Sequence, residues 1–292
     1  MTYSLSRLIC VGLLTGGVAM ATEIPTMNQD KLDVMKREMN YAQFMRQLPP
    51  DKRVILDWPA LLSVFKDADG TTWRTSGQDD YYSRRAERGA LDTRLRSDSG
   101  SMQVVVHSLS HGQEEAINQA LRMAANSNAP FVPYKYEPQC FSTFCLIPRQ
   151  QSTVESMKFV YGNIMIELSH KDHDVRPIAR YLQSAMEKAF AANPEQRLPA
   201  RPKITCAVTP TQIKAGETFT VTLPTDYPNA QWDFGFSKEL LTPNVAYDKK
   251  RMNIITLKAV SPGKGVVSFS LMDKKTLWVF TDTVTVNIDP AK

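Results

Sequence analysis

The four histidines of this sequence fall into two close pairs: His107 with His111, and His170 with His173. Each pair follows a segment with strand-like alternation and precedes a segment with helical spacing. If the two strands are parallel neighbours, both pairs lie at the same edge of one sheet, with Asp172 and Asp174 beside them. Imidazole and carboxylate groups together are ligands for zinc or copper. The pattern predicts a metal site with these four histidines as ligands, while ordinary polar residues at the starts of helices give the same pattern.

The remaining residue patterns favour a protein that is not an enzyme. Ser108 and Ser110 lie close to His107, but neither is in a Gly-x-Ser-x-Gly motif, and residues adjacent along a chain seldom form a working triad. The sequence contains no phosphate-binding P-loop and no dinucleotide-binding glycine motif. Apart from zinc or copper, no cofactor is expected.

Three cysteines follow the N-terminal segment: Cys140, Cys145 and Cys206. In an oxidising compartment two of them are expected to pair. We favour a disulfide between Cys140 and Cys145, which are close in sequence, and we expect Cys206 to be buried in a strand. Both other pairings remain open, because spacing alone does not determine connectivity.

Residues 1–21 have the layout of a secretory signal peptide. Arg7 precedes a short apolar run, Leu8–Val18, and Ala19-Met20-Ala21 matches a cleavage site. This run is too short to cross a membrane, and no later run is long enough. We expect an exported protein, periplasmic or secreted, with no integral membrane segment. Its formal net charge of +5 is spread along the chain, so nucleic acid is not an expected partner.

The clearest structural signal runs from Val154 to Phe190. Alternating apolar residues predict two strands joined by a turn at Gly162-Asn163, and helical spacing begins at Ile178. A hairpin followed by an amphipathic helix suggests a sheet with a helix on one face. Residues 22–196 are therefore expected to form an α+β domain, with a mixed sheet and helices on one face.

The rest of this domain has weaker signals. Helices are expected in Thr26–Gln47 and Gly112–Ala125, and strands in Arg53–Trp58 and Met102–Leu109. Gly77–Ser101 intersperses arginines with acidic residues, which favours an exposed helix or loop with salt bridges. Asn126–Gln151 contains four prolines and is expected to be irregular.

The sequence changes character after a short proline-bearing linker, residues 197–202. Short runs rich in Thr, Val and Phe, separated by turn signals, predict strands throughout residues 203–292. This pattern is typical of an immunoglobulin-like β-sandwich, although no Cys–Trp–Cys pattern is present.

Three stretches of this second domain carry a resemblance: Gly216–Pro224 with Trp232, Ile255–Lys264, and Trp278. They resemble the framework of chagasin-type inhibitors of papain-like cysteine proteases, and also of bacterial Ig-like modules. The resemblance implies a sandwich that contacts its partner through loops at one end. The corresponding loops here differ, because Thr225–Ala230 replaces an Asn-Pro-Thr-Thr-Gly loop and Thr276-Leu277-Trp278 replaces an Arg-Pro-Trp loop. The residues then expected to bind a partner are Tyr227, Pro228, Asn229, Trp232 and Trp278.

These observations lead to one hypothesis with two alternatives. The first is an exported, non-catalytic protein that binds or assembles with another protein through an Ig-like domain. The alternatives are a cysteine protease inhibitor of chagasin type and a periplasmic metal-binding protein that uses the paired histidines.

Overall fold

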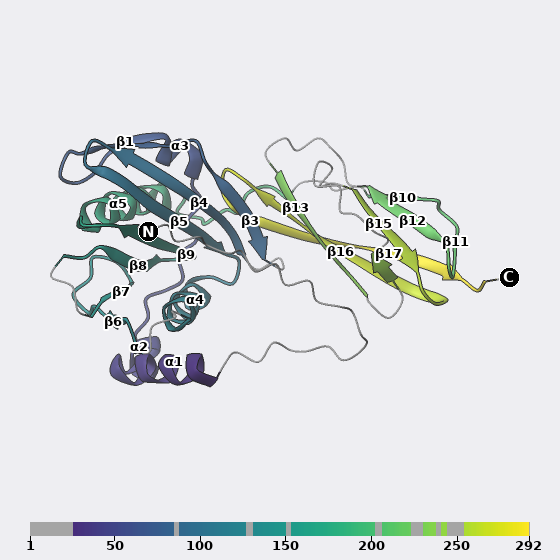
Figure 1. Cartoon of the computed structure of the whole chain (residues 1–292), viewed down its shortest axis with the longest axis horizontal. Coiled ribbons are helices and arrows are strands. Elements are labelled where there is room, and N and C mark those ends of the chain that lie inside the picture. Colours follow the sequence, from purple (N-terminus) through teal and green to yellow (C-terminus); the bar gives the residue numbers. More distant parts are fainter. Residues whose placement is uncertain are drawn as a thin grey trace, which may run out of the picture.

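The structure is a computed structural model that describes residues 26–84, 88–126, 131–149, 153–201, 206–222, 230–237, 241–243 and 254–291. The expected signal peptide lies outside the described residues. Figure 1 shows an elongated molecule, with an α+β part at one end and a β-sandwich projecting from it. None of the helices in the described ranges combines the length and apolar character needed to cross a membrane.

The α+β part is built on one nine-stranded sheet with the order β1-β2-β4-β5-β9-β8-β7-β6, and β3 also pairs with β4. The strands are β1 (Val64–Lys66), β2 (Thr72–Thr75), β3 (Asp80–Arg84), β4 (Arg88–Ser97), β5 (Gly100–Leu109), β6 (Tyr134–Tyr136), β7 (Phe144–Pro148), β8 (Ser156–Tyr161) and β9 (Ile164–His170). Every pairing in this sheet is antiparallel. The expected mixed sheet is therefore wrong.

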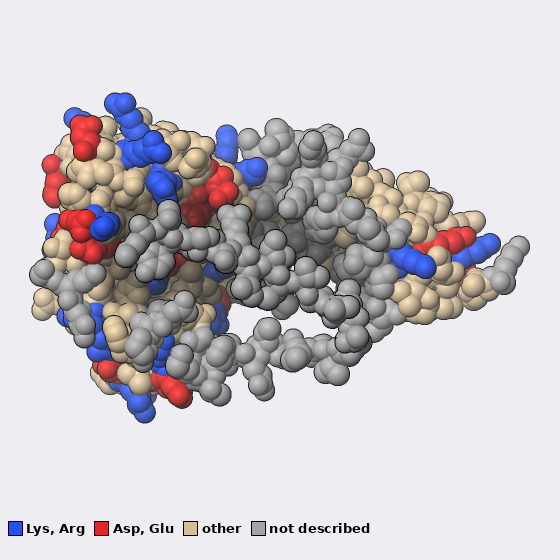
Figure 2. Space-filling view, viewed as in Figure 1, with Lys and Arg blue, Asp and Glu red and all other residues tan. Residues whose placement is uncertain are grey.

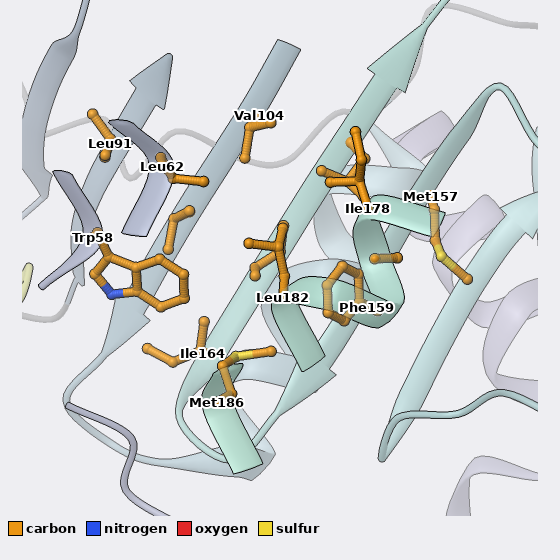
Figure 3. Packing of buried hydrophobic residues seen from close by; sticks show 14 of the residues in the cluster. Trp58, Leu62, Leu91, Val104, Met157, Phe159, Ile164, Ile178, Leu182 and Met186 are labelled. Carbon is orange, nitrogen blue, oxygen red and sulfur yellow. The ribbon is translucent and has the colours of Figure 1, made fainter. Parts of the chain in front are cut away.

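Helices cover both faces of the sheet, not the single face that was expected. On one face, α3 (Trp58–Ser63) and α5 (Arg176–Ala192) pack against Val104 and Val106 of β5. Figure 3 shows α5 side chains, among them Leu182, directed into this core. On the other face, α1 (Thr26–Glu38), α2 (Tyr41–Arg46) and α4 (Gln113–Ala125) cover a second core that includes Leu109. Alternation along β5 explains the division, because successive side chains point to opposite faces.

The predicted hairpin and helix between Val154 and Phe190 are confirmed as β8, β9 and α5. The prediction for Gly77–Ser101 is wrong, because β3 and β4 occupy it. Leu91 and Leu95 are buried on one face of β4, and the charged residues between and beyond them lie on the other face. A strand with one polar face therefore produced the alternating charges that suggested a helix or loop.

Three further expectations are corrected. Residues 51–57 form no strand, and the expected helix Thr26–Gln47 is two helices because Asn40 adopts a left-handed conformation with φ of 50°. The proline-rich segment contains β6 and β7, with Pro148 at the end of β7, where the loss of a backbone donor is tolerated.

The described residues of the C-terminal part form two four-stranded sheets, ordered β10-β12-β15-β14 and β11-β17-β16-β13. The strands are β10 (Ala207–Thr209), β11 (Ile213–Lys214), β12 (Thr218–Thr222), β13 (Ala230–Phe236), β14 (Leu241–Pro243), β15 (Ile254–Ala259), β16 (Gly263–Asp273) and β17 (Val279–Asp289). The sheets share an apolar core in which Phe219 and Leu257 of one sheet pack with Val267 of the other. Cys206 is only partly buried, just before β10.

Candidate functional site

The two histidine pairs lie at opposite ends of the sheet. β5 and β9 are antiparallel neighbours, with His107 opposite Met165 and His170 opposite Met102. Met102 and His107 are five positions apart along β5, which is about 17 Å along a strand. The expected juxtaposition, which required parallel strands, is therefore wrong. Within the described ranges, no group of three or more His, Cys, Asp or Glu side chains is placed to hold a metal ion.

The His170 ring is part of the packing at the end of β9. It contacts Trp73 edge-on with 6.0 Å between ring centroids, and the exposed His173 with 4.5 Å. Its Nδ1 lies 2.5 Å from the carbonyl oxygen of Lys171. Gly100 packs closely against the ring: a Cβ there would lie 3.2 Å from it, and the φ of 138° also favours glycine. His170 thus fills a structural position, and His111 of the other pair is exposed.

His107 belongs to a buried polar cluster with Glu167 and Lys158. Its Nε2 lies 2.9 Å from Oε1 of Glu167, and the ammonium group of Lys158 is ion-paired with Oε2 of the same carboxylate. The His107 side chain is fully buried, and the other two are mostly buried. Three neighbouring strands, β5, β9 and β8, each contribute one of these residues.

The electrostatics of the cluster fix its charge state. Burial lowers the pKa of His107, against the opposing influence of Glu167, so the imidazole is neutral near pH 7. Burial would raise the pKa of Glu167, but the hydrogen bond to His107 and the charge of Lys158 outweigh it and lower the pKa to about 2. The neutral ring therefore donates its Nε2–H to an ionised carboxylate, which Lys158 neutralises.

We expect the stability of the protein to fall as the pH drops below about 6.5. An unfolded histidine binds a proton near its ordinary pKa of 6.5, whereas folded His107 resists protonation because its pKa is lowered. The unfolded state then holds more protons, which favours unfolding. Glu167 adds a second loss between its ordinary pKa of 4.5 and its folded value of about 2. Urea unfolding between about pH 7.5 and about pH 5 measures the first loss.

The control for this prediction is His107→Gln, which keeps a donor for Glu167 but cannot titrate. Its unfolding free energy should fall less than that of the wild-type protein over the same pH range. Identical slopes for the two proteins would show that His107 has an ordinary pKa.

Glu167 and Lys158 were not among the residues expected from the sequence, although the sequence contains a signal for them. The two-residue turn at Gly162-Asn163 fixes the register of the hairpin, which places Lys158 directly opposite Glu167. Opposite charges at paired positions of a hairpin form a cross-strand ion pair. The third member, His107, comes from a strand whose position the hairpin does not determine.

The polar cluster marks the border between a covered and an open half of one sheet face. On the α4 side of this border lies the apolar row of Met165, Val160 and Phe144. On the other side, none of the apolar clusters formed by the described residues covers the sheet, and the cross-strand row Arg94, Gln103 and Ser169 is exposed. A pocket of about 460 Å³ lies here, with a lining that includes His170. Its other lining residues are Arg94, Ser101, Gln103, Glu155, Ser169 and Lys171.

A second notable feature is the loop between β16 and β17, which docks on the α+β part. Leu277 is fully buried in the same core as Trp58. The backbone N–H of Trp58 donates to the carbonyl oxygen of Lys275 at 2.9 Å, which satisfies the first donor of α3. A Cβ at Gly89 would lie 2.1 Å from the carbonyl oxygen of Leu277, so the loop sits directly on the β4 backbone.

This docking changes the interpretation of the residues expected to bind a partner. Trp278 is 7% exposed, so in this conformation it does not present the exposed surface that was expected. Trp232 lies in β13, with its backbone opposite Leu271. Tyr227, Pro228 and Asn229 lie outside the described residues. β13 begins opposite Asp273, next to the docked loop, and β13 contacts β3 of the α+β part. The start of β13 therefore lies at the end of the sandwich that faces the α+β part.

The favoured disulfide is confirmed. Cys140 and Cys145 are bonded, with 6.0 Å between their Cα atoms. Cys145 is fully buried in β7 and packs in the same core as Phe159. The bond closes the loop that precedes β7 and stabilises a segment with several prolines.

Comparison with known proteins adds no family assignment. No protein-family model matches the chain, and no curated protein matches its sequence.

Proposed function

We propose that the protein is an exported, non-catalytic binding or assembly protein that recognises another protein through an Ig-like sandwich. The observation that supports this is a difference between the two ends of the sandwich: one end is docked on the α+β part, and the other end projects away from it. The loop of residues 274–278 is docked on the α+β part, and Figure 1 shows β11 and the opposite ends of β16 and β17 far from it.

The free end of the sandwich exposes apolar side chains. Val260, which follows β15, is 50% exposed, and Val266 in β16 is 40% exposed. Val266 lies three positions from Gly263, where β16 begins opposite Ile288 at this end. Apolar side chains at the projecting end of a rigid module can contribute to a small recognition surface. We propose that these two valines contact the partner.

The same geometry bears on the two alternatives. Inhibition of a protease by the loop that contains Trp278 would require this loop to leave the core in which Leu277 is buried. Joint metal binding by both histidine pairs would require His107 in β5 and His170 in β9, which lie at opposite ends of this strand pair, to meet. Neither alternative has a described surface that favours it over binding at the free end.

The experiment begins with chemical cross-linking of the full mature chain in the cells that export it. The captured protein is then purified, and its affinity for the mature chain is measured directly. Val260→Glu and Val266→Glu should each weaken this binding at least about tenfold, because a charge then replaces an apolar contact at the interface. A complex that forms between the two purified proteins, and weakens in this way, supports the proposal.

The matched control is Val64→Glu. Val64 lies in β1 of the α+β part and is 57% exposed, so the same change there should leave binding unaltered. The proposal fails if no captured protein binds the purified chain, or if the three variants weaken binding equally. Papain activity in the presence of the mature chain is a second readout, and tight inhibition would favour the inhibitor alternative instead.

A further inference from the structure

The open half of the sheet face has a defined arrangement of polar groups. Arg94 of β4 pairs across the strands with Gln103 of β5, and Gln103 pairs with Ser169 of β9. All three side chains lie on the face opposite the α5 core, because their neighbours Leu95, Met102 and Leu168 are buried in that core. The row is exposed and forms part of the pocket of about 460 Å³.

Two cations of this pocket are available for a ligand. Within the described part of the chain, neither Arg94 nor Lys171 forms an ion pair. Both are exposed. Arg94 lies in β4 and Lys171 directly follows β9, and β5 alone separates these two strands, which places their backbones about 10 Å apart. Ser101 and Ser169 add hydroxyl groups along the pocket. An arginine and a lysine that lack partners are suited to bind carboxylates.

The acidic groups nearby are engaged within the protein. Both carboxylate oxygens of Asp92 accept hydrogen bonds of 3.0 Å from the Gln103 amide. Glu167 is paired with His107 and Lys158 in the buried cluster. Glu155 lines the pocket, is only partly exposed and has an interaction of its own. On the face of the α+β part that Figure 2 shows, charges of both signs are interspersed.

We propose that this pocket binds an acidic segment of the partner protein in an extended conformation. This inference rests on the proposed binding function and adds a second contact surface to it. An extended segment with acidic residues at alternate positions presents carboxylates about 7 Å apart on one side. Arg94 and Lys171 would each bind one carboxylate, while Ser101 and Ser169 donate hydrogen bonds to the polar groups between them. The shallow, exposed floor of the pocket suits a chain that lies across the strands.

The test uses the full mature chain and two synthetic peptides, one of alternating Glu and Gly and one of alternating Gln and Gly. The Glu peptide should bind saturably at low ionic strength, of about 0.02 M, and should be released at about 0.5 M salt. The Gln peptide should not bind. Free glutarate, a dicarboxylate without a peptide backbone, should bind much more weakly than the Glu peptide. Equal binding of glutarate would instead indicate a small-molecule site.

Substitutions test whether the Glu peptide binds at this pocket. Arg94→Gln and Lys171→Gln should each weaken binding of the Glu peptide about fivefold. Lys264→Gln, in β16 of the sandwich, is the control and should bind as the wild-type protein does. The inference is overturned if the Glu peptide does not bind, or if all three variants bind it equally. Val266→Glu should not alter binding of the Glu peptide. The peptide test and the partner test therefore probe different surfaces, and a negative result in the peptide test does not count against the proposed function.

Discussion

Glu167→Gln is expected to lower the free energy of unfolding by about 3 kcal/mol. The change removes the negative charge that pairs with Lys158, while the ammonium group remains mostly buried. A glutamine amide also has one oxygen in place of two, so it cannot accept from both His107 and Lys158 in the same way. Urea unfolding at neutral pH measures the loss, which should appear as a lower midpoint with an unchanged slope.

The double variant Glu167→Gln/Lys158→Met tests how much of this loss comes from the ion pair between Glu167 and Lys158. Met keeps much of the volume of the lysine side chain and carries no charge to bury. It should recover most of the stability that Glu167→Gln loses, because the main cost is an unpaired buried charge. If the double variant is as unstable as the sum of the two single changes, the two residues act independently and the ion pair has no stabilising role.

Leu277→Asp is expected to release the 274–278 loop from the α+β part. Leu277 is fully buried, and an aspartate at its position would bury a charge without a partner. The loss should be about 3 kcal/mol or more for the cooperative unit that contains the loop. Calorimetry should then show two separate transitions in place of one, since the sandwich and the α+β part no longer unfold together.

Two further variants, one on each side of the contact, test the same docking. Gly89→Val should have the same effect from the β4 side, because its Cβ would meet the Leu277 carbonyl oxygen. Lys275→Ala keeps the backbone carbonyl that accepts from Trp58 and removes only a weak, exposed ion pair with Asp57 at 3.9 Å. This control should cost no more than about 0.5 kcal/mol. A single transition in both Leu277→Asp and Gly89→Val would contradict the docking.

The sequence was most informative where local pattern and turn chemistry agree. Gly162-Asn163 sets the register of β8 and β9, and the helical spacing from Ile178 defines α5. For the hairpin and the helix, the contacts that decide the structure join residues that are close in sequence, so a single segment contains enough information. The favoured disulfide, Cys140 with Cys145, also joins near neighbours, but spacing alone left the other two pairings open.

Long-range contacts account for most of the differences. The relative direction of β5 and β9 decides whether the two histidine pairs meet, and no local sequence pattern distinguishes antiparallel from parallel neighbours here. β4 was missed because its charged residues lie on the open sheet face, which gives an exposed-looking sequence. The burial of Trp278 depends on a contact between the two parts of the chain, and Gly89, which permits this contact, has no local signature.

The amide of Trp58 provides the most direct measurement of the central claim, that the sandwich is held at one end by the α+β part. This N–H donates to Lys275 across the contact, and as the first residue of α3 it has no partner within its own helix. Hydrogen exchange of the protein should show slow exchange at Trp58 and much faster exchange in Leu277→Asp, with the amides at the centre of β5 protected in both proteins. Fast exchange at Trp58 in the wild-type protein would contradict the account, because the loop would then be free and Trp278 available to a partner.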